Sequence, residues 1–249
     1  MTPEETRQAA QILAEARRTG AVLKDLPAEL RPQTVEDAYA IQYSIASLFG
    51  AIGGWKVGLP KPGDEPRATP IPGIYVMASG GRWPASGPTR LEVEFAVKLK
   101  TSLPKRGTPY AREDVLGAIG SAHIALELLG ARFQDRKQVA GLTLLADGQS
   151  NGGLVVGAPI PHWTQLDLAK LEMVLRVDGA IDATVSTGAA LGPTVDALVW
   201  LANHAAEHVG GLREGQVILT GARIGPTTVP AQRSIEAQTG EARVSVTLG

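Results

Sequence analysis

Two glutamates of this sequence stand two residues apart in a run that favours β-structure. Strand residues two apart point to the same face, so Glu92 and Glu94 are predicted to project together. Val93, Phe95 and Val97 then face the core. Adjacent carboxylates on one face repel each other unless a cation or a shared proton offsets their charge.

A third glutamate stands in an even less favourable place. Glu127 is the only acid in the apolar run 122–130, where an unpaired carboxylate would be costly to bury. Together, Glu92, Glu94 and Glu127 would form an all-oxygen site for Mg²⁺ or Mn²⁺, with coordination positions left for water and substrate. The alternative on pattern alone is that the pair lines a solvated face and that Glu127 pairs with an arginine such as Arg132.

The segment 148–152 matches the G-x-S-x-G pattern of a nucleophile elbow, with Ser150 at its centre. That elbow needs a strand before the serine and a helix directly after it. The following residues, Leu154 to Gly157, favour a strand instead. We therefore expect Ser150 to bind substrate and not to act as a nucleophile.

Histidines offer two further candidate sites. His204 and His208 belong to an H-x-x-E-H pattern with Glu207 and share a helix face, as in one class of zinc site. Because the apolar stripe of that helix only partly overlaps this face, we expect the three to form its solvated side. His123 shares a strand face with Glu127 and is predicted near the carboxylates, the alternative being a hydrogen-bonded core histidine.

Helices are predicted to dominate the first fifty residues. Thr2 and Thr34 are suitable N-caps, each followed by acidic residues and an apolar stripe, and Gly50 is expected to close the second helix. Two later windows, roughly 112–119 and 194–209, are also helical, the second with Thr194 as its cap.

From Gly53 onward the chain alternates short β-favouring runs with turn residues. The predicted strands are Trp55–Leu59, Gly73–Met77, Leu91–Leu99, His123–Leu129, Leu142–Leu145, Leu154–Val156, Leu171–Val177, Val217–Leu219 and Ala242–Leu248. So many strands with few helices between them argue against a doubly wound sheet. We predict an α+β fold with a helical N-terminal region, 1–52, and a mixed-β catalytic core, 53–249, forming one continuous domain.

Composition narrows the class of protein. Of the 249 residues, 44% are apolar and 20% are charged, with a formal net charge of −1, which argues against a nucleic-acid-binding surface. No apolar stretch approaches the length of a membrane span, and the acidic N-terminus is unlike a secretory signal. Cysteine is absent, so there is no disulfide framework or thiol nucleophile. A cytoplasmic enzyme fits these features.

Eight segments together resemble the 2-keto-4-pentenoate hydratase and 4-oxalocrotonate decarboxylase family of the fumarylacetoacetate hydrolase superfamily. They are Tyr39–Gln42, Gly54–Leu59, Leu91–Ala96, Ala125–Arg132, Ala146–Gly152, Ser186–Gly188, Val199–Asn203 and Leu212–Gly221. Their order and spacing agree with the family from about residue 35 to the end of the chain.

The resemblance implies the family's mixed β-roll or barrel, a homo-oligomer, and a small 2-oxo or 2-hydroxy acid as substrate. It implies Mg²⁺ or Mn²⁺ on Glu92, Glu94 and Glu127, with Lys56 and Ser150 in the active site. In such chemistry the metal stabilises an enolate, from which the family adds water, loses CO₂, tautomerises or cleaves a C–C bond. We expect a lyase that hydrates a 2-hydroxy-alka-2,4-dienoate. The alternatives are a decarboxylase of the 4-oxalocrotonate type, a C–C hydrolase of a 2,4-dioxo acid in which His123 could act, and a binding homologue without turnover.

Two departures from the family pattern affect the substrate side. An aspartate that takes part in hydratase proton transfer is absent from the matching stretch, Pro70–Gly73, which has Ile71 instead. The loop before it, 60–69, is shortened, and Asp64 or Glu65 could substitute. The D-N-A-S segment of the family has become 147–150, Asp-Gly-Gln-Ser. Neither departure changes the expected metal ligands Glu92, Glu94 and Glu127.

Overall fold

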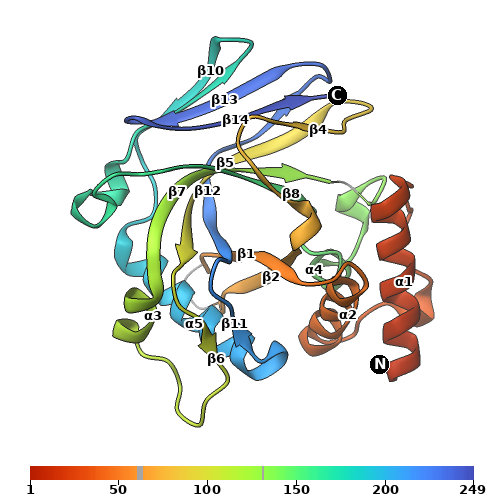
Figure 1. Ribbon diagram of the computed structural model, residues 1–249. Helices are drawn as coiled ribbons and strands as arrows, with labels where there is room; N and C mark the ends of the chain where they lie inside the picture. Colours follow the sequence, from red (N-terminus) through yellow and green to blue (C-terminus); the bar gives the residue numbers. More distant parts are fainter. Residues whose placement is uncertain (61–63, 131) are drawn as a thin grey trace.

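Two sheets and a group of helices make up the protein (Figure 1), in a computed structural model that describes residues 1–60, 64–130 and 132–249. The larger, mixed sheet has seven strands in the order β2-β1-β12-β5-β7-β8-β3 and curls round a concave interior. Its strands are β1 (Ile52–Gly58), β2 (Arg67–Pro72), β3 (Val76–Ala78), β5 (Thr89–Leu99), β7 (Ile119–Leu129), β8 (Asn151–Pro159) and β12 (Val217–Val229).

A five-stranded sheet in the order β10-β9-β13-β14-β4 covers the convex side of the larger sheet, at the top of Figure 1. Its strands are β4 (Gly81–Trp83), β9 (Met173–Val177), β10 (Ala180–Val185), β13 (Ser234–Thr239) and β14 (Ala242–Leu248). A short ladder joins β6 (Leu103–Pro104) to β11 (Gly211–Leu212). Both large sheets contribute to one apolar core, which includes Val93, Phe95 and Val97 of β5.

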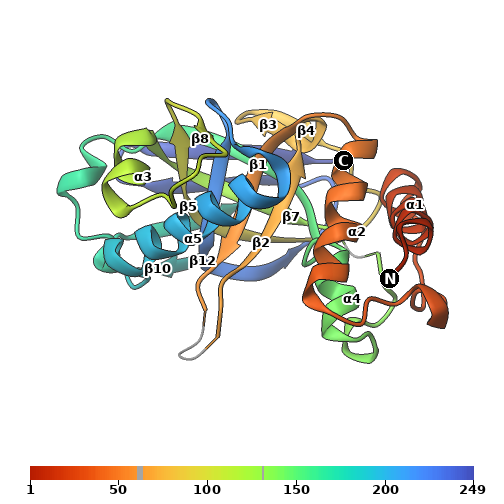
Figure 2. The ribbon, with the colours of Figure 1, turned by 90° about the horizontal axis from the view of Figure 1, so that it is seen from below.

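Five helices flank the sheets, and three of them lie together on one side (Figure 2). The helices are α1 (Pro3–Thr19), α2 (Val35–Leu48), α3 (Arg112–Ala118), α4 (Gly141–Ala146) and α5 (Leu191–Val209). Single 3₁₀ turns lie at Ala28–Leu30, Gly73–Tyr75, Arg136–Gln138, Trp163–Gln165 and Leu168–Lys170. Helices α1, α2 and α4 share a second apolar cluster, and capping boxes at Thr2 and Thr34 fix where α1 and α2 begin.

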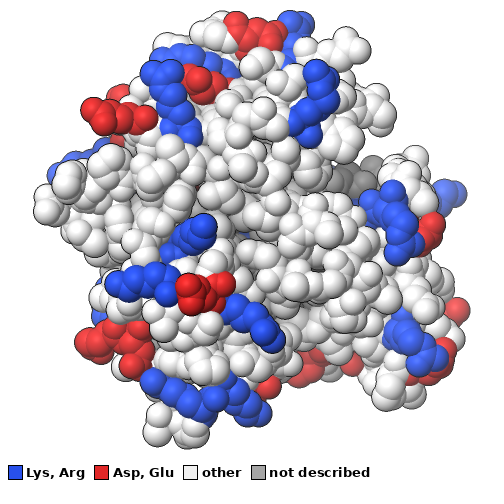
Figure 3. Space-filling model, in the orientation of Figure 1, with Lys and Arg blue, Asp and Glu red and all other residues white. Residues whose placement is uncertain are grey.

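The outside of the molecule carries charges of both signs. On the face shown in Figure 3, lysine and arginine side chains alternate with aspartate and glutamate, and neither sign forms an extended patch there. Among the described residues, no helix has both the length and the apolar character needed to cross a membrane.

The pairing of β5 with β7 decides which side chains line the concave interior. In this antiparallel ladder Glu92 lies opposite Glu127, and Glu94 lies opposite Ala125. Directly paired residues of antiparallel strands point to the same side of the sheet. All three glutamates therefore face the concave interior, while Phe95 and Val93 face the other way into the core.

The α+β class and the mixed β-core are confirmed, as are the two N-terminal helices and most predicted strands. Strand β2 was not predicted, because Pro70 and Pro72 argue against a strand interior. It is an edge strand, where a missing N–H costs no ladder hydrogen bond. Strands β4, β10 and β13 were also not predicted.

Three local predictions were wrong. Leu142–Leu145 forms helix α4 and not a strand, because a short apolar run does not by itself distinguish the two. The predicted strand at Gly73–Met77 is split into a 3₁₀ turn and β3. Helix α5 begins at Leu191, so Thr194 lies inside it, where its hydroxyl donates to the carbonyl of Ala190 at 2.9 Å.

Phe95 provides a test of the core. Its side chain is fully buried between the sheets, so Phe95→Ala should lower the free energy of unfolding by about 3–5 kcal/mol, measured by urea denaturation. Ile181, which is 65% exposed, is the control, and Ile181→Ala should change the free energy of unfolding by less than about 0.5 kcal/mol. Equal effects of the two substitutions would contradict this placement of the core.

Candidate metal centre and active site

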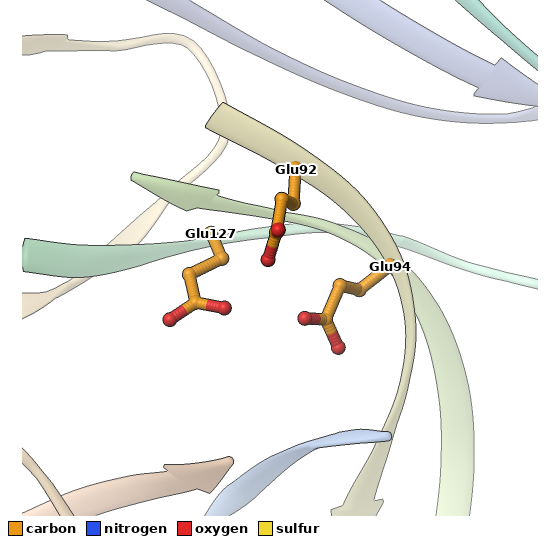
Figure 4. Close-up of side chains that lie close together, drawn as sticks. All are labelled: Glu92, Glu94 and Glu127. Atoms are coloured by element: carbon orange, nitrogen blue, oxygen red, sulfur yellow. The ribbon is translucent and has the colours of Figure 1, made fainter. Parts of the chain in front are cut away.

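Three carboxylates converge on the concave face of the large sheet (Figure 4). Each of Glu92, Glu94 and Glu127 offers an oxygen, and these oxygens all lie within 4.8 Å of one another. Glu94 and Glu127 are 1% and 0% exposed, and Glu92 is half-buried. The predicted convergence of β5 and β7 side chains is therefore present in the structure.

Lys56 of β1 reaches the same cluster across the concave interior. Its Nζ donates to Oε1 of Glu127 at 3.0 Å and to Oε2 at 2.8 Å. Burial by itself would lower the pKa of this ammonium, but the opposing effect of Glu127, Glu94 and Glu92 is larger and raises it. Lys56 is therefore a partly buried cation at neutral pH.

The cluster holds more negative charge than Lys56 can offset. Burial, and then the charge of Glu127, raises the pKa of Glu94 well above its usual value, although the backbone N–H of Gly221 donates to Glu94 Oε2 at 2.8 Å. Burial also raises the pKa of Glu92. Three carboxylates and one ammonium leave two negative charges uncompensated when all are ionised. A divalent cation would supply that charge, and carboxylate oxygens are ligands that Mg²⁺ and Mn²⁺ prefer.

The alternative pairing considered from sequence is not found. The guanidinium of Arg132 forms an ion pair with Asp147 at 2.7 Å, whereas Glu127 pairs with Lys56. The residues present thus fit a hard divalent ion held by Glu92, Glu94 and Glu127.

A second layer of hydrogen bonds orients Glu127. The amide Nδ2 of Asn151 donates to Glu127 Oε1 at 2.9 Å. Arg17 of α1 donates to the other end of that amide, Asn151 Oδ1, at 3.4 Å and to the carbonyl of Gly152 at 2.9 Å. Its guanidinium also lies 4.1 Å from the centre of the Tyr75 ring. Because Arg17 only donates, it fixes the amide with its own donor toward Glu127.

Ser150 and His123, both candidates from sequence, make hydrogen bonds of their own near the carboxylates. Ser150 is buried directly before Asn151 in a left-handed conformation, φ 66°, and Gly130 donates to its carbonyl. His123 shares the concave face but lies opposite Ala96, two pairs further along the ladder than Glu94. Hydrogen bonds with Ser121 Oγ and the Gly157 carbonyl occupy both its ring nitrogens, which favours the core-histidine interpretation.

The concave face continues below the carboxylates as an apolar floor. It consists of Ile71, Ala96, Ala125, Leu154, Val217 and Leu219. Ile71, at the position where the resemblance to the family predicts an aspartate, is fully buried in this floor. Asp64 and Glu65 are exposed and line a cavity of about 340 Å³ beside Gly58, at the end of β1.

Two misleading motifs are resolved by the structure. Strand β8 follows Ser150 directly, as predicted, so the helix that a nucleophile elbow needs is not there. His204 stacks on Trp200 and hydrogen-bonds the Tyr43 hydroxyl at 2.5 Å, so its predicted place on the solvated side was wrong, whereas Glu207 and His208 are exposed. Burial, reinforced by His208, lowers the pKa of His204 to about 4. Within the described ranges, the three glutamates form the only cluster suited to a metal ion.

Sequence reasoning missed Asn151, Arg17 and the Gly221 amide as parts of this site. Asn151 and Gly221 stand inside segments that resemble the family, and that signal could have singled them out. Arg17 belongs to a helix with no such segment, and only its long-range contact with Asn151 gives it a role.

Metal binding is the first test of this geometry. Replacing two of the three ligands in a Glu92→Ala, Glu94→Ala double variant should weaken Mn²⁺ binding by more than about a hundredfold, since even supporting residues of metal sites contribute tenfold or more. Isothermal titration calorimetry measures this directly, with Glu207→Ala as the exposed control. Unchanged Mn²⁺ affinity in the double variant would refute the site.

The hydrogen bonds through Asn151 give a second test. Arg17→Met should weaken Mn²⁺ binding by roughly threefold to tenfold, because Asn151 then loses its fixed orientation toward Glu127. The neighbouring Arg18, exposed and paired with Glu15, is the matched control, and Arg18→Met should have no effect. The Arg17→Met, Asn151→Ala double variant should bind Mn²⁺ only slightly more weakly than Asn151→Ala alone, because both substitutions remove the same interaction. Additive effects would contradict a role through Asn151.

Comparison with known proteins places the chain in a family. The fumarylacetoacetate (FAA) hydrolase C-terminal family model matches residues 67–247. The 2-keto-4-pentenoate hydratase of Paraburkholderia xenovorans (strain LB400) is 30% identical over 240 residues, which cover 91% of this chain and 87% of that one. The 2-hydroxyhexa-2,4-dienoate hydratase of Comamonas testosteroni is 30% identical over 226 residues, 85% of this chain and 84% of its own.

A similar solved structure is that of 4-oxalocrotonate decarboxylase from Pseudomonas putida G7, complexed with magnesium and adipate. It superposes with a TM-score of 0.82 at 23% identity, over 99% of this chain and 98% of that one, and it supports the fold. The resemblance noted in the sequence is confirmed: the chain belongs to the fumarylacetoacetate hydrolase C-terminal family and is a homologue of 2-keto-4-pentenoate hydratases and 4-oxalocrotonate decarboxylases.

Proposed function

We propose that the protein is a Mg²⁺- or Mn²⁺-dependent lyase that adds water to a 2-hydroxy-alka-2,4-dienoate. The observation that carries this proposal is the convergence of Glu92, Glu94 and Glu127 with Lys56 on the concave face of the large sheet. Relatives that align over most of the chain bear the names 2-keto-4-pentenoate hydratase and 2-hydroxyhexa-2,4-dienoate hydratase, which supports the choice of reaction.

The three glutamates would hold the ion, which when bound would supply positive charge to an enolate oxygen of the substrate. Lys56 is positioned beside them as a hydrogen-bond donor or proton carrier for that oxygen, and its raised pKa keeps it charged. Asn151 and the Gly221 amide keep Glu127 and Glu94 in place. The apolar floor keeps water away from the underside of the site, which strengthens these electrostatic interactions.

Hydration also needs a proton at the far end of the diene and a water activated for attack at C4. Ile71 can supply neither. Asp147 is engaged by Arg132, whereas Asp64 and Glu65 are exposed beside the end of β1. Among the described residues, Asp64 and Glu65 are thus the two of these carboxylates that no arginine engages, and they are the candidates for the relay.

Decarboxylation of a diacid of the 4-oxalocrotonate type is the second candidate. The buried Ile71 favours it, because loss of CO₂ accompanies enolate formation and no water has to be activated. A 4-oxalocrotonate decarboxylase of Pseudomonas is 33% identical over 133 residues, which adds support. C–C bond hydrolysis would require a free base near the substrate, and the hydrogen bonds at both nitrogens of His123 disfavour it.

The reaction is tested with 2-hydroxypenta-2,4-dienoate and its carboxylated homologue, each incubated with Mg²⁺ and followed by NMR. We expect a new C4 hydroxyl, with rates reduced at least about a hundredfold in Lys56→Met through loss of the general acid. Loss of CO₂ without a C4 hydroxyl would replace hydration by decarboxylation. Inertness toward both compounds would refute the proposed function.

A further inference from the structure

A large groove lies between the C-terminal end of α1 and the strands β3 and β4, on the right of Figure 1. Its volume of about 860 Å³ is sufficient for a small molecule. The groove follows the outer edge of both large sheets, because β3 is the last strand of one and β4 is the last strand of the other. Neither Lys56 nor any of the three glutamates lines it, so it is a separate surface from the metal centre.

The walls of this edge groove are apolar and partly aromatic. Tyr75, Met77 and Trp83 are half-buried there, and Ile74 is 67% exposed. The ring of Trp83 is fixed over the backbone of Gly153, where a Cβ would lie 2.3 Å from Trp83 Cη2. An apolar ligand that covers these side chains removes their surface from water, and an aromatic ligand gains further from contact with the Trp83 ring.

The charged side chains of the edge groove are arginines. It is lined by Arg17, Arg18, Arg82 and Arg132, and by no aspartate or glutamate side chain among the described residues. Arg18 forms an ion pair with Glu15, and Arg82 donates to the main-chain oxygen of Gly249 at 3.3 Å. Asp147, whose charge also reaches Arg17, is already paired with Arg132. Arg17 itself forms no ion pair with any residue that the structure describes.

The Arg17 guanidinium is therefore short of a counter-charge. It lies over the Tyr75 ring at 4.1 Å, and its Nη2 donates to neutral oxygens of Asn151 and Gly152. Burial, and then the like charge of Arg132, lowers the pKa of Arg17 to about 10, so the side chain stays charged at neutral pH at a cost in free energy. A ligand carboxylate would offset that cost through charge-assisted hydrogen bonds.

We propose that the edge groove binds a planar aromatic carboxylate, with its carboxylate on the Arg17 guanidinium and its ring system against Trp83. Such a ligand matches both the uncompensated charge and the aromatic wall. The site goes beyond the proposed reaction, and binding there does not depend on it.

A ligand on Arg17 also acts on the metal centre. Arg17 donates to Asn151, and Asn151 donates to Glu127. The ligand offsets the positive charge of Arg17, which opposes a cation at Glu127, and its contacts hold the guanidinium that orients Asn151. Both effects favour metal binding. Because coupling between two sites is reciprocal, a bound metal ion strengthens ligand binding by the same factor.

The first experiment uses 2-naphthoate as the probe and measures its affinity for the full-length protein without metal by isothermal titration calorimetry. We expect 2-naphthoate to bind about tenfold or more tightly than the uncharged 2-naphthamide. It should bind about threefold more tightly than decahydro-2-naphthoate, which is charged but saturated and not planar. Equal affinity for 2-naphthoate and either analogue, or no binding of 2-naphthoate, would overturn the inference.

Two isoleucines of nearly equal exposure locate the probe. Ile74 lines the edge groove, whereas Ile181, 65% exposed, lies on β10 at the opposite edge of the five-stranded sheet. Ile74→Glu should weaken 2-naphthoate binding about fivefold through charge repulsion, and Ile181→Glu should leave it unchanged. Arg17→Met should weaken it about tenfold, and Lys56→Met should leave it within about twofold. Weaker binding in Lys56→Met but not in Ile74→Glu would place the probe on the concave face and refute the groove.

The coupling is measured by repeating the Mn²⁺ titration with 2-naphthoate at saturation. Mn²⁺ should then bind about fivefold more tightly, and saturating Mn²⁺ should raise the affinity for 2-naphthoate by the same factor. In Arg17→Met both enhancements should disappear, whereas in Arg18→Met, which retains the contact with Asn151, both should persist. An Mn²⁺ affinity that 2-naphthoate leaves unchanged or lowers would overturn the coupling.

Discussion

Uncompensated negative charge inside the large sheet is the constraint on which the rest of the site depends. Glu94 and Glu127 are removed from water, and Lys56 offsets only one of the three carboxylates. Isolated buried charges of this kind are far too costly to persist without partners. The Gly221 amide, the Asn151 amide and the Lys56 ammonium are best explained as fixed compensation for ligands whose remaining charge a divalent ion offsets.

The sheet must curl tightly for that compensation to form. Lys56 of β1 meets Glu127 of β7 only because the edge of the sheet folds back across the concave face. Gly54 lies two residues before Lys56 on the same side of β1, and its lack of a side chain permits this curl. A Cβ at position 54 would lie 2.7 Å from the carbonyl oxygen of Val217 and 3.2 Å from Leu154 Cδ2. A larger residue would push β1 outward and separate the ammonium from its carboxylate.

How much of the fold and of the site could be predicted from sequence depends on how far apart in the chain the interacting residues lie. The shared face of Glu92 and Glu94 follows from the period of a strand, and the capped helices follow from local hydrogen bonds near Thr2 and Thr34. Glu127 was found because a lone acid in an apolar run is conspicuous. The contact of Arg17 with Asn151 spans more than a hundred residues and has no local signal. The helical state of Leu142–Leu145 depends on packing in the α1–α2–α4 cluster, which no short window contains.

The residues that were easiest to predict from sequence are the proposed metal ligands, and the residues that were hardest to predict lie on the substrate side of the site. The carboxylates that would hold a metal stand on central strands, where pairing register fixes them within narrow limits. The positions at which the sequence departs from the family pattern lie instead on the edge strand β2, which carries Ile71, and in the left-handed turn at Gln149. An edge strand pairs on one side only, and a turn pairs with no strand, so side chains there are less constrained by register than those of β5 and β7. A change such as isoleucine at position 71 can therefore redirect proton transfer and substrate choice while the metal ligands and Lys56 stay as they are.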